Sequence, residues 1–195
     1  MMVATLVCTF YLATISTTTV VLFPALLLIA GFVGEHLVER SKTKIEQDPT
    51  VSHREWVSIG FYSLIAICGI FMVGSAINFS AIVPAELTQT DGLVFTSAIA
   101  IGEGMFFHGF ILDALLSYRY PANLGVFGSP YIAMFLTASI FAVYHLQRYG
   151  GNWDLMGYVF AGGFLMAYAN YKSRRISPSM IAHWVNNVIA FLGVI

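Results

Sequence analysis

Several ionisable and amide side chains stand in stretches of the sequence that are otherwise almost wholly apolar. They are Glu103, His108, Asp113, His145 and His183, together with the adjacent amides Asn186 and Asn187. A carboxyl or imidazole group in apolar surroundings loses its hydration, so each of these residues calls for a reason. Asp113 has a structural one, because Arg119 and the basic segment 172–175 are available to pair with it.

Glu103 has the clearest chemical potential of the set. It lies between Gly102 and Gly104, and neighbours without side chains allow another helix or a substrate backbone to approach the carboxylate closely. A carboxylate in such a place is suited to act as a general base. The alternative is a structural role, in which the carboxyl group only hydrogen-bonds to a neighbouring helix.

The spacing of the histidines favours the chemical interpretation. His145 follows Phe141 by four residues and Asn187 follows His183 by four, so each pair projects from one face of a helix. A carboxylate, two imidazoles and an amide supply a base for water and donors for an oxyanion. Those groups are the minimum set for metal-free hydrolysis of an amide.

The composition indicates that lipid, rather than water, surrounds most of the chain. Of the 195 residues, 58% are hydrophobic and 10% are charged, with a mean hydropathy of +0.78, whereas soluble domains carry about 25% charged residues. The net charge of −1 argues against a nucleic-acid partner. Cys8 and Cys68 lie in apolar runs and have neither a disulfide nor a metal-type spacing. The first 34 residues contain no Lys or Arg, so we expect a retained membrane segment rather than a cleaved signal.

The apolar segments predict an all-α, polytopic membrane helical bundle of about six transmembrane helices in a single domain, residues 1–195. A helix needs about 20 residues to cross the hydrocarbon, and six segments approach or meet that length. They are Tyr11–Gly34, Trp56–Phe79, Leu93–Ser117, Tyr131–Gln147, Asp154–Tyr171 and Pro178–Ile195. We expect residues 1–92 to hold two accessory spans and residues 93–195 a four-span core. The first segment is either one tilted helix or two pieces broken near Pro24.

The basic residues predict the orientation of these spans, because Lys and Arg accumulate on the cytoplasmic side. With six alternating spans, Arg148 stands alone on one side and every other Lys and Arg falls on the other. Loops 35–55 and 172–177 are therefore predicted to be cytoplasmic, with both termini outside. The small size of the chain favours a multi-pass protein of a prokaryotic cell membrane.

Two local patterns add detail to the last spans. Gly157, Gly162 and Gly163 predict close helix contact in the fifth span, since small residues let helices approach in lipid. Ser177 followed by Pro178 predicts an N-cap and a first-turn proline at the start of the sixth. The sequence contains no internal repeat of the kind found in inverted-repeat transporters, so that function ranks lower.

Three short motifs occur in order along the predicted core. They are Glu103 followed by His108-Gly109, then Phe141-Ala-Val-Tyr-His145, then His183-Trp-Val-Asn-Asn187. Together they resemble the CPBP family of CAAX proteases and bacteriocin-processing membrane enzymes, whose motifs are E-E-x-x-x-R, F-x-x-x-H and H-x-x-x-N/D. The flank Ser177-Pro-Ser-Met-Ile-Ala before His183 also resembles the family's last motif. The resemblance covers about residues 93–195.

The resemblance implies a glutamic-type intramembrane endopeptidase that uses no metal or other cofactor. By position, Glu103 and His145 would activate a water molecule, and His183 and Asn187 would hold the oxyanion. The implied partners are membrane lipid and a peptide or protein substrate, for example a lipidated or membrane-anchored one.

The first motif departs from the family pattern at two positions. Its second Glu is Gly104 here and its Arg is His108, four residues apart, which is the spacing of an ion pair on a helix. Loss of both partners leaves no stranded charge, whereas loss of one costs roughly 3–5 kcal/mol. The departure keeps open a catalytically degenerate partner on the same fold, such as an immunity or assembly subunit.

A metal-dependent hydrolase built from Glu103, His108, His145 and His183 is a weaker alternative. Glu103 and His108 are five residues apart, roughly 140° around an α-helix, so they should point apart. One geometric demand applies to the metal-free site as well. His145 lies near the outer end of its predicted span and His183 nearer the inner end of its own. They can meet only if the fourth helix is tilted or extends past Gln147.

Overall fold

A computed structural model gives the fold and describes residues 29–30, 33, 53–77, 89–117, 129–146, 148–149 and 151–192. Within these ranges the chain forms helices and short turns, without a strand, so the all-α prediction is confirmed. The predicted first span lies outside the described residues, apart from helical residues 29, 30 and 33. Whether it forms one helix or two stays a prediction.

The described helices correspond to the second to sixth predicted spans. They are α3 His53–Ala76, α4 Gln89–Glu103, η1 Gly104–Ile111, α5 Leu112–Ser117, α6 Pro130–Tyr144, α7 Trp153–Ser173 and α8 Ser177–Phe191. The segments α4, η1 and α5 follow one another without a gap, so they form one helical stretch. Its hydrogen-bond pattern changes from α to π after Glu103 and back to α after Ile111. Its middle part, η1, is a π-helix of 8 residues.

Among the described residues, two helical segments are long and apolar enough to cross a membrane, Arg54–Ala76 and Thr96–Leu116. Pro130–Tyr144 is apolar but shorter. Of the remaining predicted spans, α7 has 21 residues but includes Asn170 and Lys172, and α8 has 15 residues that include His183 and Asn187. Of the five predicted spans that the structure describes, length and composition alone therefore support two, because α6 is short and α7 and α8 carry polar residues.

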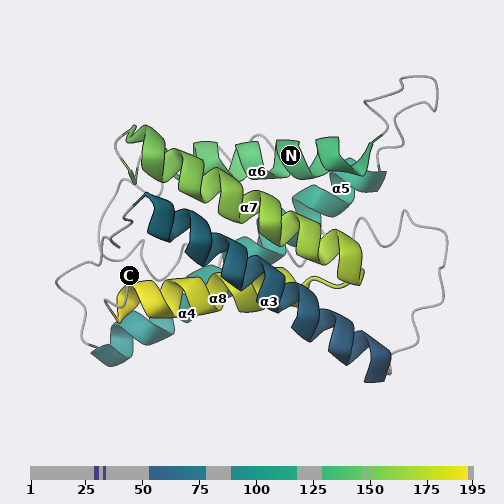
Figure 1. Ribbon diagram of the computed structural model, residues 1–195, viewed down its shortest axis with the longest axis horizontal. Helices are drawn as coiled ribbons and strands as arrows, with labels where there is room; N and C mark the ends of the chain where they lie inside the picture. Colours follow the sequence, from purple (N-terminus) through teal and green to yellow (C-terminus); the bar gives the residue numbers. More distant parts are fainter. Residues whose placement is uncertain are drawn as a thin grey trace.

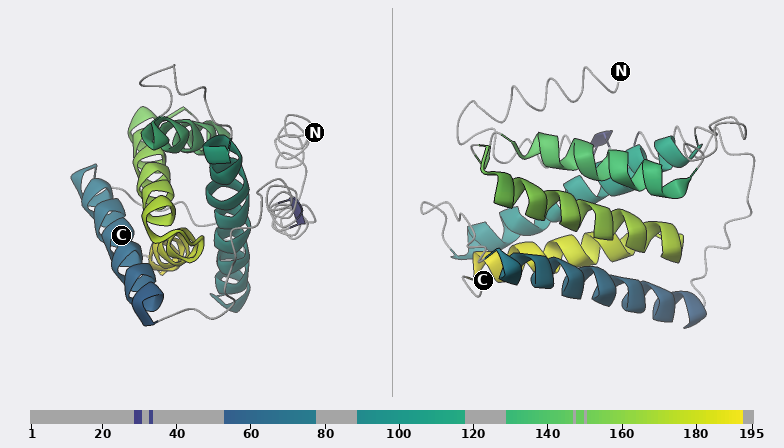
Figure 2. Two further views of the ribbon diagram at one scale, coloured as in Figure 1. Left: turned by 90° about the vertical axis from the view of Figure 1, so that its right-hand side faces the viewer. Right: turned by 45° about the horizontal axis from the view of Figure 1, so that its top comes forward.

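The third predicted span, α4–η1–α5, packs against α6, α7 and α8. Figure 1 shows α6 and α7 lying side by side, α3 crossing in front of α8, and α4–η1–α5 passing obliquely behind them. In the apolar window of Thr96–Leu116, 61% of the residues are buried, against 28% in Arg54–Ala76. The oblique arrangement is also visible in the turned views of Figure 2. The helical stretch that carries Glu103 is thus more buried than α3, which lies on the other side of α7 and α8 (Figure 2).

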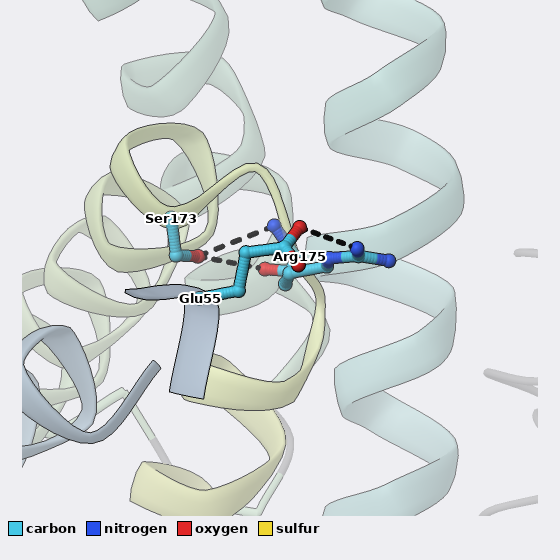
Figure 3. Close-up of polar contacts among 3 residues, drawn as sticks. All are labelled: Glu55, Ser173 and Arg175. Atoms are coloured by element: carbon cyan, nitrogen blue, oxygen red, sulfur yellow. Dashed lines mark hydrogen bonds and ion pairs between the residues drawn. The ribbon is translucent and has the colours of Figure 1, made fainter. Parts of the chain in front are cut away.

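The turn between α7 and α8 is tied to the start of α3 (Figure 3). Arg175 Nη2 donates to Glu55 Oε1 at 2.6 Å. Ser173 Oγ donates to Arg175 O at 3.1 Å and accepts from the Arg175 N–H at 3.2 Å. These contacts bring together residues of the two segments, 35–55 and 172–177, that the charge pattern predicts to lie on one side of the membrane.

One glycine of the fifth span supports close helix packing and another does not. A Cβ on Gly163 would lie 3.0 Å from Phe141 Cδ1 and 3.4 Å from Ala138 Cα, so α6 and α7 approach closely there. A Cβ on Gly162 would be in ordinary contact, 3.6 Å from Ile70 Cγ1. The prediction is wrong for Gly157, where a Cβ would meet no described atom within 4 Å.

The start of α8 differs from the predicted cap. The N-cap residue is Ile176, which makes no side-chain cap, and Ser177 is already helical. Pro178 occupies the first turn, as predicted. The assignment of Ser177 as N-cap is therefore wrong by one residue, and an N–H group of this turn finds its partner on another helix.

Candidate active site

Three of the four predicted site residues meet inside the bundle. Glu103 Oε2 lies 3.4 Å from His183 Nε2 and 3.7 Å from His145 Nε2. Glu103 is the last residue of α4, His145 follows α6, and His183 lies in α8. All three are buried, at 3%, 8% and 6% exposure for Glu103, His145 and His183.

Helix crossing, rather than a longer fourth helix, brings His145 to Glu103. Of the two alternatives, a tilted fourth helix or an extension past Gln147, the structure does not use the extension, because α6 ends at Tyr144 and His145 is its C-cap residue. The His145 N–H bonds to Ala142 O at 2.9 Å, which closes a tighter last turn. The helical stretch α4–η1–α5 runs obliquely behind the other helices (Figures 1 and 2), and Glu103, at the end of α4, lies within 3.7 Å of His145 and 3.4 Å of His183.

The hydrogen bond of His145 fixes the role of its two ring nitrogens. Nδ1 lies 2.9 Å from the carbonyl oxygen of Phe141. A carbonyl oxygen only accepts, so Nδ1 carries the proton, and in the neutral ring Nε2 is left as an acceptor. This acceptor faces Glu103 Oε2, which makes no hydrogen bond within the described part of the chain. Two acceptors that face one another need a proton or a donor molecule between them.

Phe141 is the common neighbour of three imidazole rings. The distances between ring centroids are 4.5 Å to His145, 5.2 Å to His108 and 5.7 Å to His183, all in edge-to-face geometry. Aromatic rings favour this arrangement because the positive edge of one ring meets the negative face of the other. Phe141 therefore orients the imidazoles with its ring as well as with its carbonyl group.

His108 binds a backbone carbonyl group of α7 and not the Glu103 carboxyl group that the other two histidines face. Its Nε2 donates to Gly163 O at 3.1 Å, and its buried Nδ1 has no partner among the described residues. It lies in the π-helix, where hydrogen bonds reach five residues rather than four, so the α-helical spacing assumed from the sequence does not apply. Within the described ranges, no three His, Cys, Asp or Glu side chains are arranged to hold a metal ion.

Tyr144 is a site residue that the sequence analysis missed. Its hydroxyl group interacts with the Glu103 carboxyl group. The Tyr144 ring also packs on Phe107 and His145, with centroid distances of 4.9 and 5.0 Å. The motif spacing carries no signal for Tyr144, because neighbouring residues of a helix point in different directions.

Asn187 is not brought into direct contact with the three-residue cluster. It is half-buried, one turn after His183 on the same side of α8. Its neighbour Asn186 is engaged elsewhere, since Asn186 Oδ1 accepts a hydrogen bond from the Tyr158 hydroxyl. The helix therefore positions Asn187 near the cluster, while the contacts that join Glu103, His145 and His183 do not include its side-chain amide.

Gly104 is a point of close approach between η1 and α8. A Cβ at this position would lie 2.9 Å from Met180 Cγ and 3.7 Å from Met180 Cβ. A glutamate here would have to displace Met180. Met180 of α8 thus occupies the space that a second glutamate, at position 104, would need.

The sequence of this region matches a family model described as type II CAAX prenyl endopeptidase Rce1-like, over residues 86–189. The matched segment covers more than half of the chain and includes the helices that carry Glu103, His145 and His183. The chain belongs to this family. No curated protein and no solved structure matches the chain significantly.

Membership in the Rce1-like family confirms the resemblance drawn from the three motifs. It makes the chain a helical, polytopic integral membrane protein of a protease family. The outward faces of the helices agree with lipid surroundings, because α3 exposes large apolar side chains. The most exposed are Trp56, Val57, Phe61, Leu64 and Met72.

Proposed function

We propose that this Rce1-like protein is an intramembrane endopeptidase in which Glu103 and His145 activate the attacking water. The observation that carries the proposal is the buried approach of Glu103 Oε2 to two imidazole Nε2 atoms, at 3.4 and 3.7 Å. A water that lies to the side of the two atoms, within hydrogen-bond reach of each, can bridge Glu103 Oε2 and His145 Nε2. Glu103 Oε2 and His145 Nε2 are both acceptors, so a water between them donates to both.

The chemistry follows from this arrangement. As the water oxygen bonds to the carbonyl carbon, one of its protons passes to the Glu103–His145 pair. When the carbon–nitrogen bond breaks, that proton passes to the leaving amine, and the products are a carboxylic acid and an amine. Proton transfer by a positioned side chain contributes about 10²–10⁴-fold to such a reaction.

His183 and Asn187 are proposed to hold the developing oxyanion. The His183 ring is buried, its Nε2 faces the same point as His145 Nε2, and its Nδ1 has no partner among the described residues. In the tautomer that carries its proton on Nε2, His183 can donate a hydrogen bond to an atom bound beside Glu103 Oε2. Asn187, one turn away, can add an amide N–H by a change of side-chain rotamer.

The proposed substrate is a peptide or protein that is lipidated or membrane-anchored, and no cofactor takes part. The proposed orientation places segments 35–55 and 172–177 on the cytoplasmic side of a prokaryotic cell membrane. The Glu55–Arg175 ion pair supports a common side for these segments. Trp56 and Trp153, at the starts of α3 and α7, are 61% and 81% exposed, which suits the two opposite interfaces of a bilayer.

A second candidate function is a non-catalytic membrane partner on the same fold. The observation that favours it is the pair of changes at Gly104 and His108, which are both built into the packing. Gly104 lies against Met180, and His108 is 1% exposed with its Nε2 bound to Gly163 O. Because Glu103, His145 and His183 keep a joint site, the peptidase is the proposal that we favour.

The decisive experiment is cleavage by the purified protein in liposomes, with a prenylated CAAX peptide and a pool of membrane-anchored peptides as substrates. Glu103→Ala should lower cleavage by at least about 10²-fold, because it removes the general base. Asp113→Asn is the matched control, since Asp113 is a half-buried carboxyl on the same helical stretch. Full activity in a folded Glu103→Ala variant would disprove the proposal.

A further inference from the structure

Asn170 joins two elements that carry site residues, although it lies on neither. It is a buried residue of α7. Its Nδ2 donates to the carbonyl oxygen of His108 in η1 at 3.1 Å and to Ser179 Oγ in α8 at 2.8 Å. Its Oδ1 accepts the backbone N–H of Ser179 at 2.9 Å. One amide group therefore bridges η1 and the first turn of α8.

The bond to η1 falls where the π-helix departs from α-helical pairing. In an α-helix the N–H of Leu112 would bond to His108 O, four residues earlier. Here the Leu112 N–H bonds to Gly109 O and Phe107 O instead. Asn170 Nδ2 donates to the carbonyl oxygen of His108, which the Leu112 N–H does not bind. Asn170 thus stabilises the π register that begins directly after Glu103.

The bonds to α8 replace a missing helix cap. The first N–H groups of a helix have no partner within it, and Ile176 provides no side-chain cap. Asn170 Oδ1 accepts the N–H of Ser179, which is fully buried. Ser179 Oγ in turn donates to Ile176 O at 2.9 Å. The first turn of α8 is therefore fixed by a residue of α7 rather than by its own sequence.

We propose that Asn170 is a positioning residue that sets the distance between Glu103 and His183. Ser179 lies one helical turn before His183, and His108 lies five residues after Glu103, so two short segments connect the Asn170 bridge to the site. At one end Asn170 holds the segments together, and at the other Glu103 Oε2 meets His183 Nε2 at 3.4 Å. The role in catalysis rests on the proposed peptidase function, whereas the role in geometry does not.

Disulfide formation between η1 and α8 tests the geometry without any substrate. With Cys8 and Cys68 replaced by serine, Gly104→Cys and Met180→Cys form a suitable pair, because a Cβ at 104 would lie 3.7 Å from Met180 Cβ. Disulfides need a Cβ separation of about 3.5–4.5 Å. We expect Asn170→Leu to slow cross-linking of the folded protein at least threefold.

Two further variants distinguish loss of the Asn170 bridge between η1 and α8 from a general loss of stability. Ser63→Ala is the matched control, since among the described residues the buried Ser63 hydroxyl bonds within α3, to Ile59 O at 2.7 Å, and it should leave the cross-linking rate unchanged. Asn170→Asp keeps the acceptor for Ser179 but loses the donor to His108, and it should slow cross-linking as Asn170→Leu does. Parental cross-linking rates in either Asn170 variant would overturn the inference.

The kinetic test uses the same Asn170→Leu change in the native-cysteine protein. Misplacement of Glu103 relative to His183 should lower kcat about tenfold and leave KM nearly unchanged, while Ser63→Ala changes neither. Unchanged kcat in a folded Asn170→Leu protein would refute the positioning role. If the wild-type protein cleaves nothing, the proposed peptidase function fails, and the cross-linking rates still decide the role of Asn170 in geometry.

Discussion

The Nδ1 atom of His145 donates to the backbone carbonyl of Phe141, 2.9 Å away and one helical turn earlier. The same phenylalanine places its ring edge-to-face against His145, with the centroids 4.5 Å apart. The two residues of the F-x-x-x-H motif are therefore linked through backbone and side chain at once. The four-residue spacing has a physical reason, because it stacks the imidazole over the residue whose carbonyl selects its tautomer.

Phe141→Leu removes the ring and keeps the carbonyl. We expect kcat to fall about tenfold, because three imidazoles lose their common packing surface, and the free energy of unfolding to fall by roughly 1–2 kcal/mol. Cleavage kinetics and thermal unfolding in detergent measure the two effects. Phe135→Leu is the control, since Phe135 is 53% exposed on the same helix and packs on Phe160. Equal kinetics for the two variants would contradict an orienting role for the Phe141 ring.

Tyr144→Phe removes only the hydroxyl that contacts Glu103. A hydrogen bond to a charged group contributes about 1.5–3 kcal/mol, and each 1.36 kcal/mol changes a rate about tenfold. We therefore expect kcat to fall about 10- to 100-fold, with the ring packing on Phe107 and His145 retained. Tyr131→Phe, an exposed tyrosine of the same helix, should leave kcat unchanged. A wild-type kcat for Tyr144→Phe would show that Glu103 does not depend on this contact.

The sequence was sufficient to predict the helical regions that the structure describes and three of the four site residues, those that meet. The apolar segments predict helical spans, because in lipid each span must satisfy its backbone N–H and C=O groups by hydrogen bonds within the helix. The motifs F-x-x-x-H and H-x-x-x-N each place two side chains on one face of a helix. The π-helix was not predictable, because its register is stabilised by Asn170, which lies 62 residues from His108 along the chain. For the same reason the cap of α8 was assigned to Ser177, when the partner comes from α7.

Restoring the family residues in the first motif should harm this chain rather than improve it. Gly104→Glu with His108→Arg introduces a side chain against Met180 Cγ, 2.9 Å from the new Cβ, and a larger group at a position that is 1% exposed. Overpacking of this kind typically lowers the free energy of unfolding by about 1–3 kcal/mol. We expect a lower melting temperature and no gain in cleavage.

Adding Met180→Ala to the restored pair provides the control for packing. It should recover part of the lost stability, because it removes the side chain that the introduced glutamate would meet. Cleavage that appears only after restoration, in either background, would instead identify the natural chain as the non-catalytic form. Unfolding curves and cleavage assays on the same preparations distinguish the two results.

The two glycines Gly163 and Gly157 should respond in opposite ways to alanine. In Gly163→Ala the new methyl group would lie 3.0 Å from Phe141 Cδ1 and 3.4 Å from the backbone Cα of Ala138, so α6 and α7 must separate or Phe141 must turn. We expect a loss of roughly 1–3 kcal/mol in the free energy of unfolding and lower cleavage, because Phe141 contacts three imidazoles. Gly157→Ala meets no described atom within 4 Å and should stabilise α7 by up to about 1 kcal/mol through helix propensity. Thermal unfolding in detergent compares them directly, and destabilisation of similar size in both variants would contradict the close approach at Gly163.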